Sequence, residues 1–165
     1  MKNAKFFYIF LIGGFLVYLN PAFSQSVYNF DEGLAKAKSL NKKVLINIYI
    51  EPDSWCSKME TVYSNETVKS LINADYIYVK LNGQGTEKYN YNGKQITASE
   101  LAKQFGVNGY PTHVFLNPDG SLIKFKYNGD MTSSFPGFVE AGDFEKILKY
   151  FANNQFKDTD LSKVF

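Results

Sequence analysis

The chain has 165 residues, 45% of them hydrophobic, which suits one compact domain and a short leader. Its 18 basic residues are all Lys and nearly balance 16 acids, so no basic patch argues for nucleic acid, and the lack of Arg weakens any case for bidentate phosphate recognition. The single Cys, the single His and the scattered acids show no metal-ligand spacing, so the sequence predicts no metal site and no cofactor.

The first 24 residues have the pattern of a secretory signal peptide. Lys2 and Lys5 precede an apolar run over residues 6–19, and Pro21 and small residues then prepare a cleavage site after Ser24. This run is shorter than the roughly 20 apolar residues of a membrane span. We therefore expect a periplasmic or secreted protein with no stable membrane anchor after cleavage, and an uncleaved anchor is the alternative.

The first half of the mature chain alternates helix and strand patterns. Apolar residues at helical spacing predict a first helix over residues 30–41, capped by Asn29 or Asp31. The run VLINIYI, residues 44–50, is typical of a strand buried on both faces. Two helical segments follow, one carrying Trp55, Met59 and Tyr63 and one that begins after Ser64, and then a strand over residues 76–81.

The second half contains more loop than the first. We predict a polar loop over residues 82–96 with a turn at Asn92-Gly93, a short helix over 99–105 and a strand over 112–116. A turn at residues 117–120 leads to a returning strand over 121–127, a loop over 128–142 and a final helix over 144–151. The polar tail, residues 153–165, has few apolar anchors, so we expect loose docking.

Strands that alternate with helices imply a parallel sheet core, and the late hairpin adds an antiparallel edge. The predicted fold class is therefore α/β, a three-layer α/β/α sandwich around a mixed central sheet.

This order of elements resembles the thioredoxin superfamily, and three segments carry the resemblance. They are the strand 44–50 with the following helix that holds Cys56, the segment FGVNGYPT at residues 105–112, and VFLNPDG at residues 114–120. Exported thioredoxin-related proteins are the most similar branch. The resemblance implies a thioredoxin-like domain over residues 25–152, with insertions at 83–96 and 131–139.

In this family the proline that matches Pro111 follows a cis peptide bond, which turns the backbone of Tyr110 toward the redox helix. The resemblance therefore implies that Tyr110, Pro111 and Thr112 border a groove for an extended peptide. Trp55 lies beside the same site as a substrate platform or as a cap on the helix. The expected partner is a protein or peptide client, including a thiol or disulfide protein.

The family's chemistry needs two thiols separated by two residues at a helix N-terminus, and Cys56 is the only thiol here. Two registers are open. In the first, which needs no gap after the strand and which we favour, Cys56 matches the second, resolving thiol and Asp53 stands in place of the first. In the second, Trp55-Cys56 matches the family's Trp-Cys pair, so Cys56 is the attacking thiol and Met59 replaces the resolving one.

Both registers weaken disulfide exchange. The first buries Cys56 beside a carboxylate, which raises a thiol's pKa, and the second leaves a mixed disulfide unresolved. Asn47 stands where thioredoxins often hold a buried acid, and we interpret it as a hydrogen-bonded strand residue. We expect His113 to be a half-exposed strand histidine.

Two hypotheses follow: a weak or specialised thiol-disulfide oxidoreductase or isomerase acting through Cys56, or a non-catalytic module that binds an extended client near the cis-proline groove.

Overall fold

A mixed five-stranded sheet forms the centre of the molecule, in a computed structural model that describes residues 24–165. The predicted leader, residues 1–24, lies outside the described residues except for Ser24. The strands in order across the sheet are β1 (Val27–Tyr28), β3 (Tyr76–Asn82), β2 (Lys43–Tyr49), β6 (Thr112–Leu116) and β9 (Ser134–Pro136). Strands β1, β3 and β2 are parallel, whereas β6 and β9 each run antiparallel to the preceding strand in this order. The predicted mixed sheet is confirmed.

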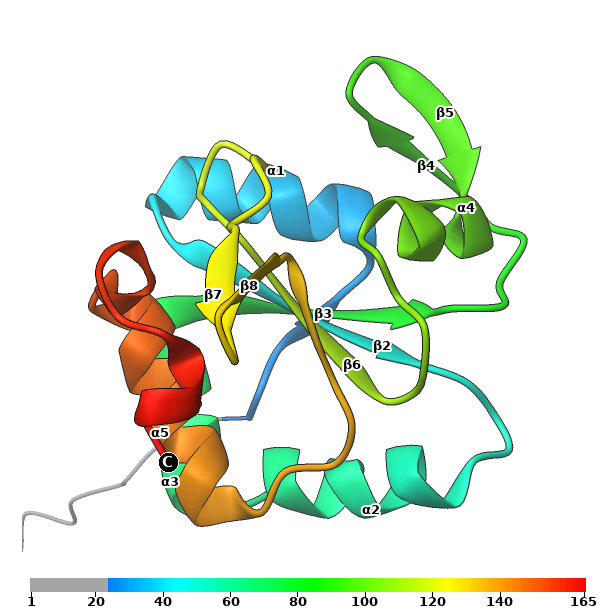
Figure 1. Ribbon diagram of the computed structural model, residues 1–165. Helices are drawn as coiled ribbons and strands as arrows, with labels where there is room; N and C mark the ends of the chain where they lie inside the picture. The colour runs from blue at the N-terminus through cyan, green and yellow to red at the C-terminus, as the bar shows by residue number, and fades with distance from the viewer. Residues whose placement is uncertain (1–23) are drawn as a thin grey trace, which may run out of the picture.

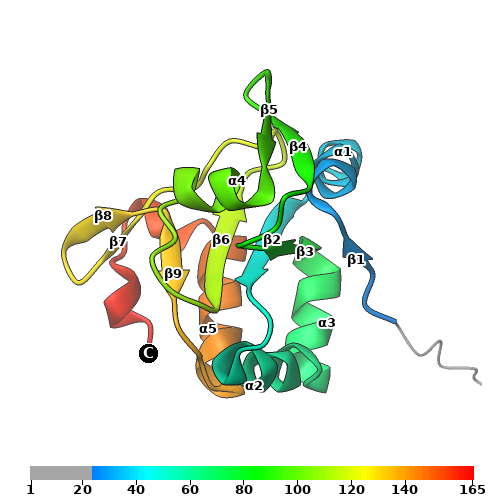
Figure 2. The same ribbon diagram turned by 90° about the vertical axis from the view of Figure 1, so that its right-hand side faces the viewer.

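Helices cover both faces of this sheet. One face carries α1 (Phe30–Leu40) and α4 (Ala98–Gln104), and the other carries α2 (Ser54–Tyr63), α3 (Glu66–Asp75) and α5 (Ala141–Ala152). Figure 1 shows the sheet between the two sets of helices, and Figure 2 shows α1 and α4 on the side opposite α2. The predicted three-layer sandwich is therefore the observed architecture.

Strand β2 is apolar along nearly its whole length because it contributes to two hydrophobic cores. Leu45 packs into the core beneath α2, α3 and α5, whereas Ile46 and Ile48 pack into the core beneath α1 and α4. Alternate side chains of a strand point to opposite faces, so a central strand with helices on both sides needs apolar residues at successive positions. The same pattern makes all five residues of β6 buried.

The segment predicted as a loop over residues 82–96 contains a hairpin instead. Strands β4 (Lys88–Tyr91) and β5 (Lys94–Thr97) pair antiparallel around Asn92-Gly93, whose φ angles of 51° and 74° suit the tight turn of a two-residue hairpin. The hairpin is held by aromatic contacts, since the rings of Tyr89 and Tyr91 each lie 5.8 Å from the ring of Phe30. The strands were not predicted because their sequence is mostly polar. Only one side of the hairpin packs on the domain, so few of its positions carry apolar residues.

The predicted strand over residues 121–127 and loop over 128–142 are also wrong in part. Only Leu122 bridges to β6, while β7 (Phe125–Tyr127) pairs with β8 (Asp130–Thr132) in a separate hairpin. The sheet edge beside β6 is filled by β9, in which Phe135 is 6% exposed. The turn at Asn128-Gly129, with φ angles of 52° and 89°, reverses the chain early and so makes the edge position available to β9.

The C-terminal tail is docked rather than loose. It forms two short 3₁₀ helices, Gln155–Lys157 (η1) and Leu161–Lys163 (η2), and Leu161 is fully buried. The hydroxyl of Tyr150 donates to the carbonyl oxygen of Thr159 over 2.8 Å, and the Asp160 carboxylate accepts from the Asn128 and Gly129 amides. Leu161, the partly buried Phe156 and Val164, and the capping Asp160 together hold a segment whose composition is mostly polar.

We expect Leu161→Ala to lower the free energy of unfolding by about 2–5 kcal/mol, the usual cost of truncating a fully buried leucine. Urea denaturation followed by circular dichroism measures this loss. Val164→Ala, a truncation in the same tail at a partly buried position, is the control and should cost less. An equal, small effect of the two variants would show that the tail contributes little to the fold.

Candidate functional site

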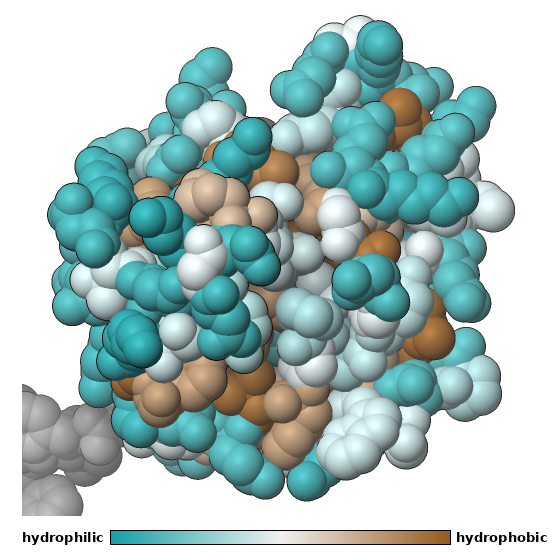
Figure 3. Space-filling view, viewed as in Figure 1, coloured by the Kyte–Doolittle hydropathy of each residue, from teal (hydrophilic) through white to brown (hydrophobic). Residues whose placement is uncertain are grey.

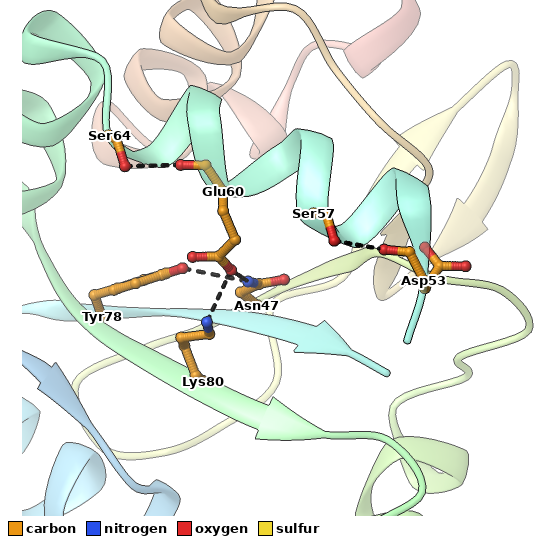
Figure 4. A network of polar contacts seen from close by, with 7 residues as sticks. All are labelled: Asn47, Asp53, Ser57, Glu60, Ser64, Tyr78 and Lys80. Atoms are coloured by element: carbon orange, nitrogen blue, oxygen red, sulfur yellow. Dashed lines mark hydrogen bonds and ion pairs between the residues drawn. The ribbon is translucent and has the colours of Figure 1, made fainter. Parts of the chain in front are cut away.

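The candidate site begins where α2 starts, after the short segment 50–53 that follows β2. Asp53 caps this helix: its Oδ1 accepts a hydrogen bond of 2.7 Å from the Cys56 amide, and its main-chain oxygen accepts from the Ser57 amide and hydroxyl. Side-chain oxygens of Asp are preferred at this position because they satisfy amides that the first helical turn leaves free. Figure 4 shows Asp53 and Ser57 at this end of α2. Cys56 therefore lies in the first turn, three residues after the cap.

Cys56 is buried, with 6% of its surface exposed. Burial is the largest influence on this thiol and raises its pKa to about 11, with further contributions from the Asp53 and Glu60 carboxylates. In the opposite direction, the hydrogen bond from the Cys56 amide lowers the pKa of Asp53. The site thus keeps a carboxylate charged at the helix start and a thiol protonated behind it.

We expect alkylation of Cys56 by iodoacetamide to be slow at pH 7 and to rise about tenfold per pH unit up to about pH 10, because only the thiolate reacts. Relative to a free thiol of ordinary pKa, the native protein should react at least about a hundredfold more slowly at pH 7. The urea-unfolded protein is the control and should react at the ordinary rate. A plateau of the native rate below pH 8 would contradict this description of the thiol.

A polar network lies further along α2, between this helix and the sheet. Asn47 Nδ2 donates to Glu60 Oε1 over 3.2 Å and to the Tyr78 hydroxyl over 3.3 Å, and the Lys80 ammonium lies 2.9 Å from the same Glu60 oxygen. Figure 4 shows Glu60 pointing from α2 toward these three side chains. Asn47 is thus a hydrogen-bonded strand residue, as expected, and it orients the carboxylate of the helix. The lysine in the otherwise apolar strand YIYVKL is the sequence signal that marks this network.

The loop before β6 approaches the same end of the sheet. Thr112 pairs with Ile48 near the end of β2, and the peptide bond between Tyr110 and Pro111 is cis. The carbonyl oxygen of Pro111 accepts from the Gly137 amide over 2.7 Å. Within residues 24–165, the hydrogen bonds of this loop leave the main-chain amide and carbonyl of Tyr110 unused.

The ring of Tyr110 packs across Gly83, which directly follows β3. Its hydroxyl donates to the Gly83 carbonyl oxygen over 3.3 Å, and a Cβ at Gly83 would lie 2.4 Å from the ring. Only glycine permits this close approach. Gly83 thereby helps to orient the ring of the residue that precedes Pro111.

Trp55 is 55% exposed and pairs with Phe138, their ring centroids 5.9 Å apart. The Lys58 ammonium lies 4.0 Å from the centroid of the Phe138 ring and 3.6 Å from Glu140 Oε1. Because Phe138 directly follows the residue that bonds to Pro111, the exposed Trp55 ring and the proline loop border one surface. Sequence reasoning missed Phe138 and Glu140, which fell in a predicted loop far along the chain.

His113 is fully buried, so the expectation of a half-exposed histidine is wrong. Its Nδ1 lies 3.1 Å from the Phe135 carbonyl oxygen, and the rings of Tyr63 and Phe144 pack against it. Burial lowers the pKa of His113 to about 4. The side chain belongs to the core under α2 and α5 and does not reach the surface beside Pro111.

Two further observations concern the described part of the chain. Among residues 24–165, no cluster of three or more His, Cys, Asp or Glu side chains is arranged to hold a metal ion. In the same residues, no helix combines the length and apolar character that crossing a bilayer requires.

Comparison with known proteins gives the family. The model of a thioredoxin-like domain matches residues 30–152, and the chain therefore belongs to this thioredoxin-like family. Among curated proteins, none matches the chain significantly.

Solved structures agree on the fold. The chain is similar to a thioredoxin from Thermus thermophilus, with 24% identity and a TM-score of 0.56 over 78% of this chain and 87% of that one. It is also similar to a thioredoxin-fold protein from Helicobacter pylori, with 18% identity and a TM-score of 0.61 over 85% and 84%. A third similar structure is the oxidoreductase DsbH, with 17% identity and a TM-score of 0.54 over 79% and 85%. The fold is thus one used by thiol-disulfide oxidoreductases, carried here by a chain with a single cysteine.

Proposed function

We propose that the protein is an exported thioredoxin-like module that holds an extended client segment in the groove beside Tyr110, Pro111 and Trp55, while Cys56 supports at most weak or specialised disulfide exchange. The observation that carries this proposal is the burial of Cys56 beside the Asp53 carboxylate, which raises the pKa of the thiol to about 11. Disulfide exchange needs an accessible thiolate. A site that suppresses both the charge and the exposure of its only thiol is better suited to binding than to turnover.

The position of Asp53 supports the first of the two registers. Asp53 caps α2 and Cys56 follows three residues later in the first turn, which is the spacing of a two-thiol motif at a helix N-terminus. The carboxylate accepts a hydrogen bond from the Cys56 amide. A thiolate at the same place would accept the same hydrogen bond. In this proposal Asp53 stands in place of the missing first thiol.

The groove itself offers both main-chain and aromatic contacts. An extended peptide pairs with free main-chain groups and gains affinity from them, while flanking pockets select its side chains. Tyr110 supplies a free amide and carbonyl, and the exposed Trp55 ring, supported by Phe138, supplies an apolar platform. The signal-peptide pattern at the start of the sequence supports a periplasmic or extracellular location for such clients.

A thiol-disulfide oxidoreductase or isomerase acting through Cys56 is the second candidate. It is favoured by the location of Cys56 in the first turn of α2, where the helix dipole stabilises a thiolate. The structural similarity to DsbH, described as an oxidoreductase, agrees with the same relationship. Under this alternative the thiol would have to become exposed when a client binds.

A binding experiment separates these functions. We expect a fluorescent peptide of alternating Ser and Val residues, with Lys at each end and no Cys, to bind the wild type and to bind Cys56→Ser equally well. Trp55→Ala should weaken binding about tenfold, since an exposed Trp at a groove is a typical binding hot spot. Leu40→Ala, at a half-exposed apolar position on the distant α1, is the control. Failure of the peptide to bind, or equal binding by Trp55→Ala, would contradict the proposed groove.

A further inference from the structure

A second surface, away from Cys56, lies between the β7–β8 hairpin and η1. Lys124 and Lys126 are both exposed on the same side of the chain around β7, because side chains two residues apart in a strand share a face. Met131 pairs with Lys126 across the hairpin and is 61% exposed. With Phe156 and Lys157 from η1, these residues line a pocket of about 230 Å³.

The pocket is cationic with an apolar lining. Lys124, Lys126 and Lys157 form no ion pair among the described residues. The positive field of Lys157 extends beyond the pocket, since this residue, together with the larger effect of burial, lowers the pKa of Lys43. Asp158 is the one acid in the lining. Three lysines and one aspartate thus surround the exposed Met131 and the half-buried Phe156, so the lining combines a net positive charge with exposed apolar area.

The hairpin that carries two of these lysines is fixed in place. The Asp160 carboxylate accepts hydrogen bonds from the amides of Asn128 and Gly129 at the hairpin turn, over 3.1 and 2.7 Å. The same acid also accepts from Ser162, and these hydrogen bonds lower the pKa of Asp160 to about 2. The tail and the hairpin are thus joined through a charged cap, so the lysines are presented on a fixed frame. In Figure 1 the hairpin and the C-terminal segment lie beside each other, and Figure 3 shows this face as mostly hydrophilic with small hydrophobic areas between.

We propose that this pocket binds an acidic peptide segment, in which carboxylates pair with Lys124, Lys126 and Lys157 and a neighbouring apolar side chain packs on Met131 and Phe156. The complementarity of charge and apolar area is the basis of the proposal. Lys is a compact, strongly hydrated point charge that suits single carboxylates spaced along a flexible chain. The volume of the pocket suits one or two side chains.

An anionic bilayer fits this surface less well than a peptide. Clusters that bind acidic lipids carry 4–8 basic residues, and only three lysines line this pocket. A recess between two elements also takes up a side chain more readily than a flat membrane surface.

This site goes beyond the groove at Cys56 and does not depend on it. The pocket is lined from β7, β8 and η1, whereas the groove is formed at the start of α2 and the loop before β6. A client that used both would have to carry an acidic stretch outside the extended segment held near Pro111. Variants of the two sites should therefore act separately on peptides that carry only one of these features.

The test uses a fluorescent, amide-capped peptide of Leu-Glu repeats and the matching Leu-Gln peptide, with fluorescence anisotropy on the protein without its leader. We expect the Leu-Glu peptide to bind and the Leu-Gln peptide to bind at least about tenfold more weakly, because charged hydrogen bonds contribute most of the selectivity. Affinity for the Leu-Glu peptide should fall as salt is raised. Equal binding of the two peptides, or no binding of either, would overturn the proposal.

Charge reversal identifies the pocket. We expect Lys126→Glu to weaken binding of the Leu-Glu peptide at least about tenfold. Lys94→Glu, an identical change in net charge on the exposed β4–β5 hairpin, should leave it unchanged. Matching unfolding midpoints of the two variants check that both are folded. Equal losses in both variants would overturn the proposal. Binding to phosphatidylglycerol vesicles that depends on Lys126, without any binding of the peptide, would also overturn it.

Discussion

Replacing Asp53 by cysteine should give the chain a reducible disulfide and a thiol-disulfide activity that the wild type lacks. Asp53 Oδ1 lies 2.7 Å from the Cys56 amide at the start of α2, so a thiol at residue 53 is held beside the first turn that carries Cys56. A cysteine at a helix N-terminus in a Cys-X-X-Cys arrangement has its pKa lowered to between about 3.5 and 7.5. By contrast, a pKa near 11 leaves Cys56 about one part in ten thousand ionised at pH 7.

We therefore expect Asp53→Cys to reduce insulin with dithiothreitol at least about a hundredfold faster than the wild type, since the thiolate fraction rises by several orders of magnitude. The disulfide is measured by mass spectrometry before and after reduction. Ser54→Cys, which places the new thiol two residues from Cys56 instead of three, is the matched control. If Asp53→Cys forms no bond with Cys56, or if Ser54→Cys forms one as readily, the first register is wrong.

The second large effect concerns stability in acid. Burial lowers the pKa of His113 from 6.5 to about 4, so the unfolded chain takes up a proton at this residue well before the folded protein does. The stabilisation is fully present above pH 6.5 and is lost as the pH falls toward 4. We expect the free energy of unfolding to decrease by about 3 kcal/mol over this interval from His113 alone.

Urea denaturation at several pH values measures this slope. His113→Gln, whose amide can still donate toward the Phe135 carbonyl oxygen, should have a shallower dependence between pH 6.5 and 4.5, by up to about 1.4 kcal/mol per pH unit. The difference in slope, unlike the absolute stability, is unaffected by any packing loss in the variant. Identical slopes in the two proteins would mean that His113 is protonated in the folded state or is not buried.

Much of the fold was predictable because its central elements carry strong local patterns. The run VLINIYI indicates a strand with helices on both sides, and β2 is buried in two cores as this pattern requires. Strands β4, β5 and β8 were missed, and β7 was predicted only as the end of a longer strand, since three or four partly exposed residues have too little periodicity to identify. The docked tail was missed because its few apolar residues, Phe156, Leu161 and Val164, are separated by polar ones and show no periodicity.

The candidate site was predictable only where its residues are neighbours in the sequence. Asp53, Trp55 and Cys56 lie within four positions, and at the start of a helix such residues all fall within the first turn. Phe138 and Glu140 reach the same surface through the loop after β9, and sequence patterns do not encode a contact over such a separation. His113 was misjudged because its exposure depends on β9 covering one edge of β6 and on α5 packing above it.

The reduction of insulin by dithiothreitol, compared between the wild type and Cys56→Ser, tests most directly whether this fold binds clients without exchanging their disulfides. A buried, protonated sulfur should leave the two proteins with the same rate, equal to that of dithiothreitol alone. A wild-type rate clearly above that of Cys56→Ser would show that the thiol is exposed and ionised in use, and would contradict the proposed function.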